Sequence, residues 1–233
     1  MTKKLDDQDK QDAIKIILTG FNTTGNWAAY DVASTLQGLV SADVKGSSSN
    51  GGRDLHIETV ILPPTYEGIS TKVAELHADH SWDFLIHVGP GHGSSNESRI
   101  PKGAERMGYD ELDAEGQFAP MINPLRGTRG LEGKGRKWHT TVDVDGLVRH
   151  LTQTRGHQAI SSCDNPGLGG TGFAYASSLK AASKNGDGVR PVLCFLRPGT
   201  DNVEPSGSAS QTKEILLDIC DWLASNTSKG KSQ

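Results

Sequence analysis

The sequence lacks the features that identify several large classes of protein. Its three cysteines, Cys163, Cys194 and Cys220, include no CxxC pair, so neither a disulfide framework nor a zinc ribbon is indicated. No apolar run approaches the roughly 20 residues of a membrane-spanning helix. Residues 1–12 are charged and have no signal-peptide core. We therefore expect a cytoplasmic protein without structural disulfides and without a membrane partner.

An excess of positive charge is also absent. The chain has 24 lysines and arginines against 28 aspartates and glutamates, a formal net charge of −4, and no basic run exceeds two residues. A nucleic-acid partner is therefore not expected. His77 and His80 lie on one predicted helix without a further ligand, so no metal site is predicted. The glycines at 167–172 are not followed by Gly-Lys-Ser/Thr, and we predict no cofactor.

Glycine, in contrast, is abundant. It accounts for 28 of the 233 residues, roughly one in eight, against about 7% in typical proteins. The glycines have no three-residue period, which excludes collagen. Several of them follow short apolar runs, as at Gly20 and Gly89. Glycines in such places are typical of tight turns and of close approaches between backbones.

The apolar runs alternate with segments of helical periodicity. They are apolar runs rather than alternating patterns, which is typical of strands in a parallel sheet covered on both faces. We therefore predict an α/β fold of three α/β/α layers with a mostly parallel, twisted central sheet. The predicted strands are residues 14–18, 55–62, 84–88, 157–161 and 191–196. The predicted helices are residues 26–40, 66–80, a segment capped by Thr140 or Thr141 that reaches 151, 173–182 and 208–223.

A single domain is predicted at residues 13–226, between disordered tails at 1–12 and 227–233. Residues 46–53 are expected to form a flexible loop. Residues 94–139 lack clear periodicity and are rich in glycine, proline and charge, which predicts an irregular insertion that could form a lid. Ligands of parallel sheets bind beyond the carboxyl ends of the strands. The loops expected at that rim are 19–26, 89–101, 162–172 and 196–201.

Six short motifs, in one order along residues 14–225, resemble those of pyroglutamyl peptidase I, a family of cysteine peptidases. They are Thr19-Gly20-Phe21 with Gly25-Asn26, 83–89 (DFLIHVG), Gly108-Tyr109 with Asp113, 140–145 (TTVDVD), 175–179 (YASSL) and 190–193 (RPVL). The resemblance implies the α/β/α fold of that family. It also implies a possible homo-oligomer, because the family is often oligomeric. The RPVL stretch resembles eukaryotic, fungal-like members.

The resemblance also implies where the family's catalytic residues would lie. The cysteine position falls on Thr171 and the histidine position on Leu196. The carboxylate falls on Pro101, or on Glu97 after a small shift, and a pocket phenylalanine is matched by Thr24. A threonine hydroxyl without a base is too weak to attack an amide, and leucine cannot accept a proton. The chain is therefore interpreted as a divergent member with a degenerate catalytic triad.

Other polar residues of the predicted rim are candidates for binding and acid/base roles. An imidazole or carboxylate there could move a proton, and backbone amides near Gly170 could hold an oxyanion. The structural alternatives are solvated loop positions for His92, Glu97 and Arg99, a turn cap for Asn165, and an ion pair with Asp201 for Arg197. The predicted catalytic residues are His92, Glu97 and Thr171. The predicted substrate-binding residues are Phe21, Thr24, Arg99, Asn165, Gly170 and Arg197.

Three functions remain open from the sequence. The first is a repurposed, non-peptidase enzyme that acts on a small organic molecule by acid/base isomerisation, cyclisation, dehydration or hydrolysis, in fungal biosynthesis by analogy. The second is a non-catalytic pseudoenzyme or ligand-binding protein. The third is an active pyroglutamyl peptidase. Convergence of His92, Glu97 or Arg197 on one pocket would favour the first.

Overall fold

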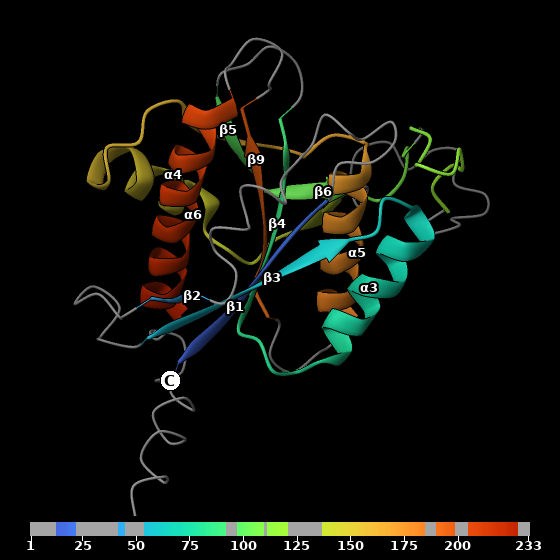
Figure 1. Ribbon diagram of the computed structural model, residues 1–233, viewed down its shortest axis with the longest axis horizontal. Coiled ribbons are helices and arrows are strands. Elements are labelled where there is room, and N and C mark those ends of the chain that lie inside the picture. Colours follow the sequence, from blue (N-terminus) through green and yellow to red (C-terminus); the bar gives the residue numbers. More distant parts are fainter. Residues whose placement is uncertain are drawn as a thin grey trace, which may run out of the picture.

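Seven strands form the central sheet within the residues that the computed structural model describes, which are 13–21, 42–44, 54–91, 97–109, 111–120, 137–184, 190–198 and 205–227 (Figure 1). Their order across the sheet is β2-β3-β1-β4-β9-β5-β8. The strands are β1 (Ile14–Phe21), β2 (Ala42–Val44), β3 (Leu55–Leu62), β4 (Phe84–Pro90), β5 (Ser98–Pro101), β8 (Ile160–Cys163) and β9 (Val192–Arg197). The predicted helix at 26–40, the loop at 46–53 and most of the two tails lie outside the described residues, as do Thr24 and His92.

The middle of the sheet is parallel. β3, β1, β4 and β9 run in one direction, while β2 pairs with β3 in the opposite direction. β5 is antiparallel to β9, and β8 is parallel to β5. The prediction of a mostly parallel sheet is therefore confirmed. However, β8 runs against the central strands, so the loop that follows it does not start at their carboxyl ends as we had expected.

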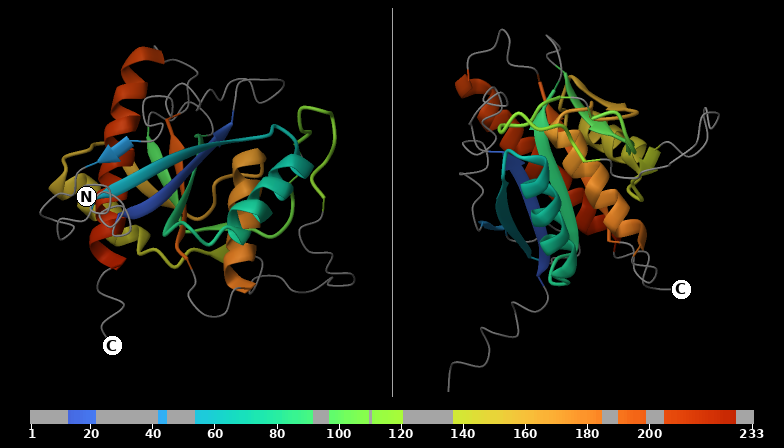
Figure 2. Two further views of the ribbon diagram at one scale, coloured as in Figure 1. Left: turned by 60° about the horizontal axis from the view of Figure 1, so that its bottom comes forward. Right: turned by 90° about the vertical axis from the view of Figure 1, so that its right-hand side faces the viewer.

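Helices cover both faces of the sheet and complete three layers (Figures 1 and 2). One face is covered by α3 (Tyr66–Ala78) and α5 (Gly170–Lys184), and the other by α4 (Val144–Arg149), the π-helical turn η3 (His150–Thr154) and α6 (Pro205–Thr227). Successive side chains of a strand point to opposite faces. Leu18, Ile86 and Phe195 therefore join the α4/α6 core, and Ile17, Leu85 and Leu196 join the α3/α5 core.

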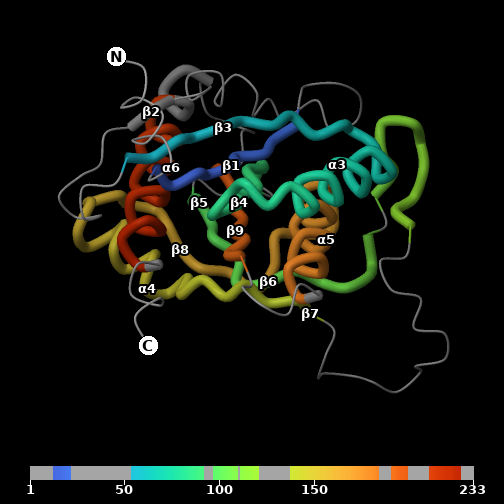
Figure 3. Tube along the Cα trace, turned by 90° about the horizontal axis from the view of Figure 1, so that it is seen from below, coloured from blue at the N-terminus to red at the C-terminus, as the bar shows by residue number. Residues whose placement is uncertain are grey.

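The segment predicted to be an irregular insertion contains regular structure. It contributes β5 to the main sheet, and β6 (Gly103–Glu105) pairs with β7 (Lys137–His139) in a two-stranded ribbon. In the tube view this ribbon lies near the end of α5 (Figure 3). These strands are only three or four residues long and include Pro101, Arg99 and Lys137, so they form no apolar run that periodicity could detect.

Several element boundaries differ from the prediction. β1 and β4 continue through glycine to Phe21 and Pro90, because their neighbours go on pairing with them. β8 begins at Ile160 rather than 157. Helix α4 is capped by Asp143, whose side chain accepts the Gly146 N–H at 2.9 Å, and not by Thr140 or Thr141.

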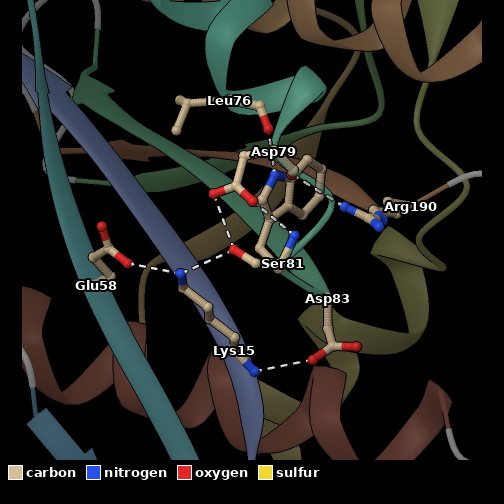
Figure 4. Close-up of polar contacts among 8 residues, drawn as sticks. Lys15, Glu58, Leu76, Asp79, Ser81, Asp83 and Arg190 are labelled. Atoms are coloured by element: carbon tan, nitrogen blue, oxygen red, sulfur yellow. Dashed lines mark hydrogen bonds and ion pairs between the residues drawn. The ribbon is translucent and has the colours of Figure 1, made fainter.

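A polar cluster holds the opposite, amino-terminal edge of the sheet (Figure 4). The Lys15 ammonium lies 3.0 Å from the Glu58 carboxylate and donates to Ser81 Oγ at 3.1 Å. Asp79 Oδ1 accepts the Ser81 N–H at 2.9 Å. Arg190 donates to the backbone oxygen of His80 at 2.7 Å. These contacts fix the turn between α3 and β4, far from the rim where β1, β4 and β9 end.

Candidate functional site

Several residues that were singled out from the sequence lie at one level of the sheet. This level is close to the carboxyl ends of the central strands. Gly89 of β4 pairs with Leu196 of β9, and Leu196 pairs with Arg99 of β5. Thr19 pairs with His87, so Phe21 lies at the level of Gly89, two residues further along both strands. Phe21 and Leu196 belong to the α3/α5 core. All four residues therefore lie on the sheet face that α5 covers.

Thr171 lies directly over this level. It is the second residue of α5, it is only 8% exposed, and it packs against the backbone of Gly89. A Cβ atom placed on Gly89 would lie 2.2 Å from Thr171 Oγ1 and 2.4 Å from its Cγ2. Glycine at position 89 is thus required for this approach. The structure brings Thr171, Phe21 and Arg99 to one rim.

The turn before α5 sets the position of Thr171 at the rim. β8 ends at Cys163, level with Pro101, and the chain then reverses. Asn165 Oδ1 accepts the Gly167 N–H at 2.8 Å, and Gly167 has a φ of +92°. Asn165 therefore caps a turn, which was its structural alternative. Gly170 is buried as the first residue of α5.

Glu97 and Arg99 lie at the outer part of the rim. Arg99 Nε is 3.8 Å from Glu97 Oε2, and the two side chains are 40% and 37% exposed. Surface pairs of this kind contribute little to stability, about 0–1 kcal/mol. Both charges remain accessible from solvent, which is compatible with either a binding role or the solvated alternative.

The Cys163 thiol lies near this pair but is not activated. Its Sγ donates to the backbone oxygen of Asn165 at 3.3 Å. Burial raises the pKa of the Cys163 thiol, although the nearby Arg99 charge acts in the opposite direction. The thiolate is the nucleophilic form of cysteine. Cys163 is therefore protonated near neutral pH. Burial also raises the pKa values of the Cys194 and Cys220 thiols.

Arg197 does not join the same face. It follows Leu196 on β9, and alternation along the strand directs it to the α4/α6 side. Leu196 itself is 2% exposed and packs in the apolar core. Of the candidates, Thr24 and His92 lie outside the described residues, so the predicted convergence of His92 with Glu97 or Arg197 stays a prediction.

A buried polar chain lies one level below the rim. His87 Nδ1 and Thr19 Oγ1 are 2.7 Å apart, and His87 Nε2 and Ser178 Oγ are also 2.7 Å apart. Burial, with a smaller effect of the His77 charge, lowers the pKa of His87 to about 3. The imidazole is neutral and fully enclosed, so it ties α5 to the sheet and has no access to a ligand.

Sequence reasoning missed one acidic residue at the helix end. Glu111 is exposed, and its carboxylate packs on Gly169, the residue before α5. A Cβ atom on Gly169 would lie 2.5 Å from Glu111 Oε2. The only sequence signal was its position between Gly108-Tyr109 and Asp113, which belong to one of the six motifs. In the described part of the chain, no group of three or more histidine, cysteine or acidic residues could hold a metal ion.

Solved structures with the same architecture are found among the pyroglutamyl peptidases. Pyroglutamyl peptidase I of Bacillus amyloliquefaciens superposes with a TM-score of 0.71 and 16% identity, covering 91% of this chain and 98% of that one. Pyrrolidone carboxyl peptidase of Fervidobacterium islandicum AW-1 gives 0.69 and 18%, with 90% and 98% covered. A single-residue variant of the Pyrococcus furiosus enzyme gives 0.68 and 18%, with 88% and 96% covered.

These similarities establish the fold: the chain has the α/β/α architecture of the pyroglutamyl peptidase I structures over most of its length. No protein-family model matches the sequence, and no curated protein matches it. No helix within the described ranges is long and apolar enough to cross a membrane.

Proposed function

We propose that this protein is a divergent member of the pyroglutamyl peptidase I family whose cleft serves a different chemistry. It acts on a small organic molecule by proton transfer and hydrogen bonding, in an isomerisation, cyclisation, dehydration or hydrolysis, without a cofactor. The observation that carries the proposal is that Thr171 and Leu196 lie next to the same residue of the rim, Gly89. Thr171 covers Gly89, and Gly89 is the direct strand partner of Leu196.

This pair supports loss of the peptidase reaction. By the motif match, Thr171 stands where the family has its nucleophilic cysteine and Leu196 where it has its histidine. Cysteine peptidases need a thiolate with a base in hydrogen-bond reach. Leu196 is buried in the apolar core, and the Cys163 thiol is protonated. Among the described residues, neither Leu196 nor Cys163 would activate a nucleophile for attack on an amide.

Other features support retention of a ligand site. The rim keeps Gly89, the packed Thr171 hydroxyl and the accessible charges of Glu97 and Arg99. A proton can be moved by a placed carboxylate, and hydrogen-bond donors can stabilise developing charge. By analogy with the fungal-like members that the RPVL stretch resembles, the proposal includes a role in secondary metabolism in the cytoplasm, with a small-molecule substrate and possible homo-oligomers.

The first test asks whether the peptidase reaction is absent. Purified protein is incubated with the fluorogenic substrate L-pyroglutamyl-7-amido-4-methylcoumarin, and we expect no release of the fluorophore above the blank. Hydrolysis that is abolished by thiol alkylation would overturn the proposal in favour of an active cysteine peptidase.

The second test asks whether the cleft catalyses another reaction. A small-molecule extract is incubated with wild-type protein, with Thr171→Val and with heat-inactivated protein, and is then compared by mass spectrometry. We expect one species to be consumed by the wild type and spared by Thr171→Val, which keeps the shape of the buried side chain but lacks its hydroxyl. Binding of a species that is released unchanged would instead favour the non-catalytic ligand-binding protein.

A further inference from the structure

Two exposed apolar residues belong to one short segment, residues 111–118, which we call the 111–118 turn. Within the described ranges, the exposed large apolar residues are Ile61, Leu112 and Phe118, at 41%, 41% and 67%. Scattered exposed apolar residues are common on protein surfaces and need no explanation. Leu112 and Phe118 are different, because they belong to a segment that folds back on itself.

The fold of the turn brings these two residues to adjacent positions. The Asp113 N–H donates to the Gln117 backbone oxygen at 2.9 Å, and the Gly116 N–H donates to the Asp113 backbone oxygen at 3.0 Å. Gly116 has a φ of +73°, a conformation that favours glycine in a tight turn. Leu112 and Phe118 come directly before and directly after the two residues that close the turn. They therefore lie on neighbouring positions of its two arms and form one apolar pair at the surface.

The turn is fixed to the start of α3, at the edge of the molecule (Figure 3). Asp113 Oδ2 accepts the Tyr66 N–H at 3.0 Å, and the Tyr66 hydroxyl donates to the Glu111 backbone oxygen at 2.8 Å. The Ala114 N–H donates to the Pro64 backbone oxygen at 3.1 Å. A binding surface on an ordered backbone loses less conformational entropy when a partner docks. The turn therefore presents its apolar pair from a fixed support.

The charge on the turn is of one sign. The turn has the three acidic residues Glu111, Asp113 and Glu115, and the sequence has no lysine or arginine from 107 to 125. Asp113 is buried and holds the turn, whereas Glu111 and Glu115 are exposed. Two exposed carboxylates thus accompany the apolar pair. Charges of one sign around an apolar contact favour a partner of the opposite sign and disfavour a partner of the same sign.

This charge selects among the occupants that an apolar surface could have. Anionic lipid headgroups and nucleic-acid phosphates would meet carboxylates of their own sign. A second copy bound through the same surface would place Glu111 and Glu115 near their own counterparts, because a two-fold interface pairs a surface patch with itself. A protein segment with apolar side chains flanked by lysine or arginine matches both the apolar pair and the charge.

We propose that the 111–118 turn is a docking surface for a partner protein, which binds it through a basic, apolar segment. Phe118 is the anchor, because aromatic side chains contribute most to binding when a partner buries them, and Leu112 extends the apolar contact. Glu111 and Glu115 form a charged rim that accelerates association and makes it depend on salt. None of these four is a predicted catalytic or substrate-binding residue, so the inference stands apart from the proposed function.

The test uses a defined probe, a fluorescein-labelled synthetic peptide with leucines on one side of a helix and lysines on the other. Its binding to the full-length protein is followed by fluorescence anisotropy. We expect saturable binding at about 50 mM salt that weakens at about 500 mM, because salt screens exposed charges. Phe118→Ser should raise the dissociation constant about tenfold or more, as is typical of the loss of an aromatic anchor. The double variant Glu111→Gln/Glu115→Gln should also raise it and should reduce its salt dependence.

The chain provides matched controls for both kinds of change. Ile61→Ser alters an exposed apolar residue of β3, and Glu75→Gln/Glu214→Gln removes two exposed charges from α3 and α6. Neither control should change the dissociation constant by more than about twofold, because the altered side chains lie outside the turn. Phe118→Leu keeps an apolar anchor and should retain most of the affinity. Thermal unfolding of each variant checks that the fold is kept.

Several outcomes would overturn the proposal. Absence of peptide binding up to about 1 mM, or equal affinity of the wild type and Phe118→Ser, would exclude the 111–118 turn as the docking surface. Equal salt dependence of the wild type and the double glutamine variant would exclude a partner selected by its positive charge. A dimer that sedimentation detects in the wild type and that dissociates in Phe118→Ser would show that a second copy of the chain occupies the turn.

Discussion

Gly89 is the residue on which the geometry of the rim most directly depends. A methyl group there would meet Thr171 Oγ1, Cγ2 and Cβ at 2.2, 2.4 and 2.7 Å. Because Thr171 is β-branched and anchored in the first turn of α5, it has little freedom to move away. The two side-chain positions, far apart in the sequence, therefore constrain each other.

We expect Gly89→Ala to lower the free energy of unfolding by about 1–3 kcal/mol, as is typical of overpacking. Thr171→Gly alone should cost about 0.5 kcal/mol in helix propensity plus the lost packing of the threonine side chain, and adding Gly89→Ala to it should cost little more. Urea unfolding of the two single variants and the double variant measures this coupling. If Gly89→Ala lowers the free energy of unfolding by the same amount in the wild type and in Thr171→Gly, the close packing is contradicted.

At the scale of elements, the start of α3 depends on a side chain from another segment. The Tyr66 N–H, in the first turn of α3, donates to Asp113 Oδ2, and the Glu115 and Gln117 N–H groups donate to Asp113 Oδ1. Thr65 caps the same helix locally by accepting the Gly68 N–H at 3.2 Å. Asp113 thus joins the helix start to the turn that presents Glu111.

Asp113→Ala should lower the free energy of unfolding by about 2–4 kcal/mol, because it leaves buried N–H donors without an acceptor. Hydrogen exchange should accelerate at Tyr66, Glu115 and Gln117, and it should stay unchanged at the centre of β1. Asp113→Asn keeps one acceptor oxygen and should cost less. If all three amides exchange at the wild-type rate in Asp113→Ala, Asp113 does not hold this turn.

The element boundaries separate what local pattern can reveal from what it cannot. β3 and β9 are mostly apolar stretches bounded by proline or glycine, and the sequence located them to within a residue or so. β5 has four residues, one of them a charged arginine and another a proline, and periodicity gave no sign of it. It forms because β9 and β8 offer backbone partners on both sides, which is a tertiary and not a local cause.

At the scale of the whole molecule, two buried imidazoles link stability to pH. Burial, with a contribution from the Arg190 charge, lowers the pKa of His77 to about 4, and burial lowers the pKa of His87 to about 3. In the unfolded chain both would bind a proton near pH 6.5. Between these values the unfolded state binds more protons, so stability is complete above about pH 6.5 and falls as the pH falls toward 4 and 3.

We expect a loss of about 2–3 kcal/mol per imidazole between pH 7.5 and 4.5. His77→Phe keeps the edge contact with Trp82, whose ring centroid lies 5.3 Å away, and removes the buried His77 Nε2, which has no hydrogen-bond partner. This variant should be at least as stable as the wild type at pH 7.5 and should lose less stability by pH 4.5. Urea unfolding at both values measures the difference, and parallel losses would contradict the assignment.

The candidate site, like the strands, has features that the sequence could predict and others that depend on tertiary packing. Glycines at strand ends predicted where the rim lies, and the motif match predicted that Thr171 and Leu196 belong to it. The side chain of Asn165, a predicted substrate-binding residue, caps the turn at Gly167. Arg197 belongs to β9, and alternation along the strand directs its side chain to the other face of the sheet. The position of Glu111 against Gly169 could not be predicted, because it depends on packing between distant segments.

The sequence by itself determined the kinds of layer in this protein. Apolar runs and helical periodicity are local properties, so they specify buried strands, covering helices and the α/β class without reference to partners. Only the tertiary structure decided that β5 and β8 run against the central strands and that Thr171 covers Gly89. It also decided that Glu111 lies at the start of α5. Strand direction and cross-chain packing depend on which distant backbones pair, and no local spacing of residues encodes that choice.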